Sequence, residues 1–195
     1  MANYYDINSE FYIKNTLYCN MEELYEPFLK YLNKGDSILD AGCGTSRDTL
    51  NFIKRGYNVS AFDNSQKMVD FANSLSNIKV EKKSFLDIDY KEEFDGIWAC
   101  ASLLHVDRIN LPLAFTNLYS ALKRDGILYC SFKCRASDFS TEDRNFTCFT
   151  KSSFKTFIDD LSLFSILEIF ITHDIRDNRE NELWLNAIMR KTTSS

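Results

Sequence analysis

The residues best suited to chemistry lie in the segment 38–46, Ile-Leu-Asp-Ala-Gly-Cys-Gly-Thr-Ser. Its start fits the end of a buried strand. Gly42 and Gly44 then predict a tight turn whose backbone could approach a ligand closely. Thr45 or Ser46 could cap the helix that follows, and the free N–H groups at a helix start attract a polar ligand. The segment therefore predicts a strand, a turn and a helix start that together hold a nucleotide-like molecule.

Two residues beside this turn restrict the kind of nucleotide. A dinucleotide-binding turn carries a third glycine where this chain has Arg47, and it places a pyrophosphate at the helix start. Asp40 stands two residues before the first glycine, where its charge would repel a diphosphate but could attract a cation. We therefore expect a cationic nucleoside ligand without phosphate groups.

A second acidic residue stands at the end of the next predicted strand. Asp63 follows Gly42 by 21 residues, a spacing at which a carboxylate can accept hydrogen bonds from both ribose hydroxyls. The alternative is an acid that only complements the dipole of the helix starting at Ser65. Ribose binding is the interpretation that agrees with the ligand expected from the glycine turn.

Further motifs follow the glycine turn in a fixed order. They are Phe62-Asp63-Asn64-Ser65, Ser84-Phe85-Leu86-Asp87, Phe94-Asp95-Gly96-Ile97-Trp98, Ser102-Leu103-Leu104-His105-Val106 and Leu122-Lys123-Arg124-Asp125-Gly126. Over residues 3–191 the chain resembles the class I S-adenosylmethionine-dependent methyltransferases, and most of all the small stand-alone group related to tellurite resistance. The resemblance implies an α/β, three-layer Rossmann-like fold. Its seven-stranded sheet is mostly parallel, with a C-terminal antiparallel strand and helices on both faces.

The resemblance also implies which residues contact the cofactor, S-adenosylmethionine, and its product, S-adenosylhomocysteine. Asp87 should accept from the adenine amino group, or else be a surface acid in a turn. Asp40 should act indirectly, by holding the glycine turn or a water molecule. Arg47 could pair with the cofactor carboxylate or belong to a solvated helix face. The full set is Tyr12, Thr16, Asp40, Gly42, Cys43, Gly44, Arg47, Asp63, Asn64, Phe85, Leu86, Asp87 and Ala101.

The acceptor side is less well defined by sequence. Methyl transfer needs mainly alignment, because the sulfonium is already activated, and it needs a base only when the acceptor must lose a proton. His105 is therefore a weak catalytic candidate, and its alternative role is to order the loop before the next helix. With His105, the residues Lys133, Arg144 and Trp184 resemble positions that line the acceptor side, where they could hold a small anion. For each residue taken singly, a solvated surface position is an equal alternative.

Alternating strand and helix patterns predict one methyltransferase domain over residues 1–195. Within it we expect an N-terminal helical cap over 1–36, a cofactor-binding core over 37–133, and an acceptor-side segment with terminal strands over 134–195. Predicted strands cover 37–41, 58–62, 78–82, 94–100, 126–132, 164–172 and 183–190. Predicted helices cover 6–17, 20–32 with Asn20 and Glu23 as a capping box, 46–55, a segment after Ser65, 111–122 and 150–161.

Composition limits the partners. The formal net charge is −5 and no basic stripe is present, which argues against nucleic acid and for a small-molecule acceptor. No apolar run reaches a membrane span, and no secretory leader is recognisable. The six cysteines form no C-x-x-C pair, so we expect reduced thiols and no metal. Zinc at Cys130, Cys134 and Cys148 is the alternative, but their spacing is not that of the usual zinc ligands.

These observations predict a cytoplasmic enzyme that is a monomer or a weak dimer. Two other functions compete with methyl transfer. A nicotinamide-dependent oxidoreductase would share the fold, but the chain lacks the third glycine and a Tyr-x-x-x-Lys pair. A non-catalytic regulatory protein that binds S-adenosylmethionine is the stronger alternative, because the acidic residues at the strand ends indicate only cofactor binding and not catalysis.

Overall fold

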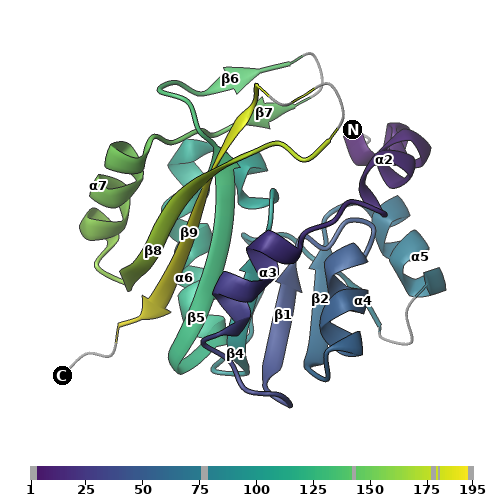
Figure 1. Cartoon of the computed structure of the whole chain (residues 1–195), viewed down its shortest axis with the longest axis horizontal. Helices are drawn as coiled ribbons and strands as arrows, with labels where there is room; N and C mark the ends of the chain where they lie inside the picture. The colour runs from purple at the N-terminus through teal and green to yellow at the C-terminus, as the bar shows by residue number, and fades with distance from the viewer. Residues whose placement is uncertain (1–3, 76–78, 142–143, 177–178, 180, 193–195) are drawn as a thin grey trace.

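The computed structural model describes residues 4–75, 79–141, 144–176, 179 and 181–192. Its main sheet has seven strands in the order β3-β2-β1-β4-β5-β9-β8; the pairs from β3 to β5 are parallel, and β9 runs antiparallel to both β5 and β8 (Figure 1). Its strands are β1 (Ser37–Ala41), β2 (Asn58–Asp63), β3 (Glu81–Lys82), β4 (Phe94–Ala99), β5 (Leu122–Lys133), β8 (Phe164–His173) and β9 (Leu183–Lys191). The predicted fold class is therefore confirmed.

Helices cover both faces of this sheet. They are α1 (Tyr4–Ile7), α2 (Ser9–Thr16), α3 (Glu22–Leu29), α4 (Arg47–Lys54), α5 (Gln66–Leu75), α6 (Leu111–Ala121) and α7 (Lys151–Leu161), with the 3₁₀ turns η1 (Leu103–His105) and η2 (Arg108–Asn110). Helices α3, α4 and α5 contribute to the apolar clusters on one face, and α6 and α7 to the cluster on the other. A small hairpin of β6 (Phe139–Ser140) and β7 (Asn145–Phe146) lies beyond the sheet (Figure 1).

An aromatic cluster fixes α3 against the sheet. Trp98 and Tyr129, on neighbouring strands, stack with their ring centroids 3.8 Å apart. Phe28 from α3 and Phe52 from α4 pack against Trp98, and all four side chains are fully buried. Gly96 allows the close approach of α3 and the residues after it, because an added Cβ would lie 2.9 Å from Phe28 Cζ and 2.7 Å from a Leu32 methyl group. Burial of large aromatic side chains is a strong source of packing energy, so this cluster anchors the N-terminal helices.

The predicted elements are present, but several ends differ. The helix expected over 6–17 is divided into α1 and α2, and the first strand of the terminal antiparallel pair ends one residue later than predicted. The capping box at Asn20 is wrong: Met21 occupies the cap position, and Asn20 instead accepts from the Glu22 N–H at 3.0 Å. Ser46 is the cap residue of α4, but its φ of 58° leaves its side chain without a capping bond. Of the strand predicted over 78–82, residues 81–82 form β3, and residue 78 lies outside the described part.

Among the described residues, no helix is both long enough and apolar enough to cross a membrane.

Candidate cofactor and acceptor site

Two adjoining cavities open where the central parallel strands end. The larger has a volume of about 870 Å³ and the smaller about 420 Å³, and pockets of this size commonly hold metabolites. Ala101, His105 and Arg144 line both cavities. Ligands bound in the two cavities would therefore meet at these three residues.

The glycine turn forms one wall of the smaller cavity. Gly42 and Gly44 have φ values of 76° and 52°, a region that glycine adopts without steric cost. A Cβ at Gly42 would lie 2.5 Å from Ser102 Cβ, because the loop after β4 presses on the turn. Ser102 in turn donates from its hydroxyl to the Ala41 carbonyl at 2.7 Å. This position therefore requires glycine for both conformation and space.

Asp63 lies beside this turn and lines the smaller cavity with Asn64. Its two carboxylate oxygens accept from the backbone N–H groups of Gly44 at 2.9 Å and Ser65 at 2.8 Å. Burial raises the pKa of Asp63, against the lowering effect of these hydrogen bonds. Each oxygen can accept more than one hydrogen bond, so the carboxylate can still receive ligand hydroxyls. The structure thus brings Asp63, Asn64 and the glycine turn together.

The loop after β3 supplies the opposite wall. Phe85 and Leu86 line the smaller cavity, and the Phe85 ring meets Phe62 edge-on with a centroid distance of 5.3 Å. Asp87 is exposed and is not among the residues lining the cavity. Its carboxylate accepts from the Ser84 N–H at 2.6 Å, so it holds the turn that carries Phe85 and Leu86.

Two predicted cofactor residues lie beneath the cavities. Asp40 is buried and accepts from the Thr49 hydroxyl at 2.6 Å, which links β1 to α4. Burial, and then the nearby Asp48 carboxylate, raise the pKa of Asp40. The side chain of Cys43 packs against the cluster formed by α5 and β2, and lines neither cavity. Asp40 and Cys43 can thus contribute through the backbone and through packing.

Arg47 lines the larger cavity and is held rigidly. Its Nε and Nη2 donate to Asp48 at 2.6 and 2.9 Å, and its Nη1 donates to the Thr16 carbonyl at 3.3 Å. The alternative of a solvated helix face is therefore wrong, because the side chain is only 20% exposed. Thr16 is buried and lines the same cavity. Tyr12 belongs to α2, and its side chain lies outside the described part of the chain.

The predicted acceptor residues all line the larger cavity: His105, Lys133, Arg144 and Trp184. Lys133 ends β5 and forms ion pairs with Glu182 and with Asp174, the latter at 3.5 Å. Its Nζ lies 4.3 Å from the centre of the Trp184 ring. Burial lowers the pKa of Lys133 to about 8. The lysine therefore belongs to an ion-pair network in the cavity wall.

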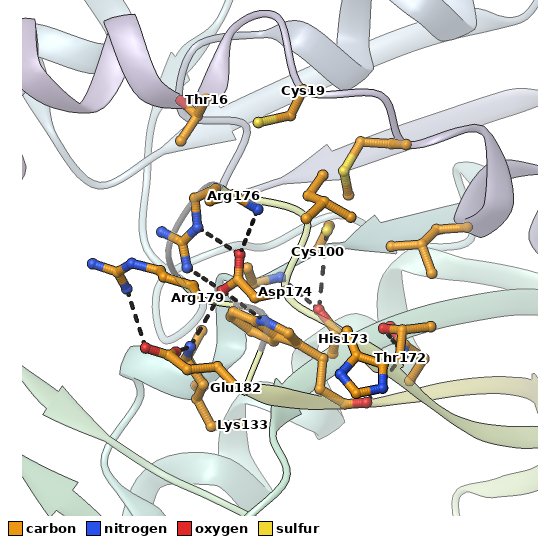
Figure 2. A pocket seen from close by; sticks show the side chains of 18 of the residues that line it. Thr16, Cys19, Cys100, Lys133, Thr172, His173, Asp174, Arg176, Arg179 and Glu182 are labelled. Carbon is orange, nitrogen blue, oxygen red and sulfur yellow. Dashed lines mark hydrogen bonds and ion pairs between the residues drawn. The ribbon is translucent and has the colours of Figure 1, made fainter.

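Asp174 is the centre of that network and was missed by sequence reasoning. It accepts from Arg176 Nε at 2.8 Å (Figure 2). It also accepts from Trp184 Nε1 at 3.0 Å. Burial acts to raise the pKa of Asp174, but the hydrogen bonds from Arg176 and Trp184 outweigh it and keep the carboxylate ionised. The loop between β8 and β9 is thereby fastened to the end of β5.

His105 lies where the two cavities meet. Its Nδ1 donates to the Asn145 carbonyl at 3.2 Å, and its ring lies 5.0 Å from that of Phe146. Burial lowers the pKa of His105 to about 4, so the ring is neutral near pH 7. The contact with Asn145 agrees with the loop-ordering role, and the residue lines both cavities.

Among the described residues, no cluster of histidine, cysteine and acidic side chains could hold a metal ion. Cys130 and Cys148 are buried and Cys134 is partly buried, and all three are free thiols.

Comparisons with known proteins agree with this geometry. Residues 38–126 match the family model described as a methyltransferase domain. An uncharacterized methyltransferase of Staphylococcus carnosus is 32% identical over 115 residues, which cover 55% of this chain and 56% of that protein. The matches to this and a second curated relative span 56% and 59% of the lengths of those relatives.

Solved structures share the whole fold at low sequence identity. The 1,6-didemethyltoxoflavin-N1-methyltransferase of Burkholderia thailandensis, solved with S-adenosylhomocysteine, has a TM-score of 0.78 at 18% identity, over 97% of this chain and 84% of that one. The [4+2]-cyclase SpnF has a TM-score of 0.77 at 15% identity, over 97% of this chain and 94% of that one. Residues 38–126 therefore resemble a methyltransferase domain, and the chain shares the fold of these two solved structures.

Proposed function

We propose that this protein transfers the methyl group of S-adenosylmethionine to a small-molecule acceptor. The observation that carries the proposal is the pair of cavities that meet at Ala101, His105 and Arg144. The glycine turn and Asp63 border the smaller cavity, and the predicted acceptor residues line the larger one. A cofactor and an acceptor bound in these cavities would have their reacting atoms at the shared boundary.

In the proposed complex the adenosine part of the cofactor occupies the smaller cavity. Its ribose hydroxyls donate to Asp63, and Phe85 and Leu86 flank the base. The amino-acid part passes the glycine turn and reaches Arg47 and Thr16 in the larger cavity. Asp87 acts through the turn it holds, since its carboxylate bonds the Ser84 N–H.

The transfer itself is an in-line displacement. A lone pair on the acceptor forms a bond to the methyl carbon while the carbon–sulfur bond breaks and its electron pair stays on sulfur. The protein contributes alignment and exclusion of water, which account for much of the acceleration in such reactions. The acceptor rests in the larger cavity near Lys133, Arg144 and Trp184, and His105 faces the junction.

A small acceptor fits the charge and the size of the site. The net charge of −5 disfavours a polynucleotide, and the cavity of about 870 Å³ lies within the range used for metabolites. We further propose the tellurite-resistance-related group as the nearest subgroup, and a cytoplasmic monomer or weak dimer. Tellurite accordingly belongs in any panel of acceptors.

Two measurements test the proposal. Calorimetry with S-adenosylhomocysteine should show binding at one site per chain. Incubation with radiolabelled S-adenosylmethionine and a panel of small acceptors, tellurite included, should place label in a low-mass fraction. Label found only in RNA, DNA or protein would contradict the small-molecule proposal. Cofactor binding without methyl transfer to any class of acceptor would favour the regulatory alternative.

A further inference from the structure

A buried carboxylate with several hydrogen-bond donors, Asp48 in the first turn of α4, lies next to Arg47 of the larger cavity. It is buried, with 6% of its surface exposed. Besides the two hydrogen bonds from Arg47, it accepts from Tyr25 Oη at 2.5 Å and from Trp98 Nε1 at 2.8 Å. Its partners thus come from α3, α4 and β4. A buried carboxylate is costly unless it is paired and hydrogen-bonded, and this one satisfies that requirement fully.

The network determines the position of Arg47. Two parallel N–H···O contacts to Asp48 fix the plane of the guanidinium, and the third, to the Thr16 carbonyl, ties it to the end of α2. The described contacts use three of the five N–H groups that an arginine carries. Arginine binds carboxylates through this planar fork, so the remaining N–H groups are suited to a carboxylate in the larger cavity.

The place of Arg47 relative to Asp63 identifies the part of the ligand that it would meet. Arg47 lines the larger cavity and Asp63 the smaller, and Gly44, three residues before Arg47, donates its N–H to Asp63 at 2.9 Å. A nucleoside whose ribose binds Asp63 and whose 5′ substituent passes the glycine turn would direct that substituent toward Arg47. In S-adenosylmethionine this substituent ends in an α-amino acid, whose carboxylate matches the guanidinium.

We propose that Asp48 is a positioning residue for the amino-acid end of the cofactor, and that Tyr25 and Trp98 hold it in place for this task. The inference rests on the proposed function. It adds that α3, far from the adenosine pocket, contributes to cofactor affinity through Tyr25. Burial acts to raise the pKa of Asp48, but the charge of Arg47 and the hydrogen bonds from Arg47, Tyr25 and Trp98 together lower it and keep the carboxylate ionised.

The test compares two ligands that share the adenosine and the thioether. S-adenosylhomocysteine carries the amino-acid end, and 5′-methylthioadenosine lacks it. Asp48→Asn should weaken S-adenosylhomocysteine by about 10-fold or more, because a charge-assisted pair that fixes Arg47 is lost. The affinity for 5′-methylthioadenosine should change less than about twofold, which is within the error of such comparisons.

Two further variants control the test. Asp95→Asn removes a carboxylate that pairs with Lys123 at 2.8 Å, far from both cavities, and should leave both affinities unchanged. Tyr25→Phe removes one hydrogen bond to Asp48 but no charge, so it remains informative if Asp48→Asn fails to fold. It should weaken S-adenosylhomocysteine by about two- to fivefold and leave 5′-methylthioadenosine unchanged, the size expected for one indirect hydrogen bond.

The outcomes separate the inference from the function on which it rests. Equal weakening of both ligands, or unchanged S-adenosylhomocysteine affinity in both variants, would overturn the positioning role and leave Asp48 a structural residue. A wild-type protein that binds neither ligand would overturn the proposed function, and the inference with it.

Discussion

Replacing Gly42 by alanine tests whether the glycine turn is constrained as the structure indicates. The added Cβ would lie 2.5 Å from Ser102 Cβ, 3.2 Å from Ser102 Oγ and 3.7 Å from the Phe85 ring. The backbone at Gly42 also has a φ of 76°, which an alanine adopts at a cost. The substitution therefore combines a backbone effect with a steric overlap.

Each effect has a known size. A left-handed conformation costs a residue with a Cβ about 1–2 kcal/mol, and forcing extra atoms into a packed site costs about 1–3 kcal/mol. We expect Gly42→Ala to lower the free energy of unfolding by about 2–5 kcal/mol, the sum of the two. Because Gly42 also lines the smaller cavity, affinity for S-adenosylhomocysteine should fall as well.

Urea unfolding followed by circular dichroism measures the loss of unfolding free energy. Two further variants separate the backbone effect from the steric effect. Gly35 has a φ of 90° and no neighbouring atom within 4 Å of an added Cβ, so Gly35→Ala should show the backbone effect alone. Ser102→Gly removes the atom that the new Cβ would meet. Combined with Gly42→Ala, it should recover about 1–3 kcal/mol as a coupling energy.

Two results would refute this reasoning. One is a Gly42→Ala variant within about 0.5 kcal/mol of the wild type, the size of an ordinary surface substitution. The other is strict additivity of Gly42→Ala and Ser102→Gly, because residues that do not overlap have no steric coupling to relieve.

Three other predictions concern single carboxylates and the histidine. Asp63→Asn should weaken S-adenosylhomocysteine by about 1.5–3 kcal/mol in calorimetry, since charge-assisted bonds to the ribose are lost; equal affinity would remove Asp63 from the ribose role. His105→Asn should keep cofactor affinity and lose less than about 10-fold in turnover, whereas loss of a general base costs about 10²–10⁴-fold; a thousandfold loss with unchanged affinity would make His105 the base. Burial, and then Asp48, raise the pKa of Asp40 above its ordinary value of 3.8, so the folded state favours the protonated carboxyl. The contribution of Asp40 to stability is therefore full below pH 3.8 and declines as the pH rises above 3.8. The free energy of unfolding of Asp40→Asn relative to the wild type, measured with urea, should therefore be more favourable at pH 8 than at pH 5. A difference in unfolding free energy that does not depend on pH would contradict the raised pKa of Asp40.

The sequence by itself determined the elements whose signals are local. The apolar run before Gly42 and the turn after it predicted β1 and the start of α4, and both are present at nearly the expected residues. Ser65 caps α5 as expected, accepting from the Met68 N–H at 3.3 Å. Asp63 lies at the end of β2, next to the turn. Each of these features depends on residues close together in the sequence, so the hydrophobic periodicity and the turn-forming residues were enough to predict it.

Only the tertiary structure decided which side chains bond beneath the cavities. In the sequence, Asp48 has only the features of an acidic residue in the first turn of a helix. In the structure it accepts hydrogen bonds from Tyr25 and Trp98, which are 23 and 50 residues away. Asp174, just after β8, likewise pairs with Lys133 at the end of β5, and β9 lies between these two strands. These partners depend on how helices and strands pack against each other, and an acidic residue costs little in a solvated turn but must find donors once packing buries it.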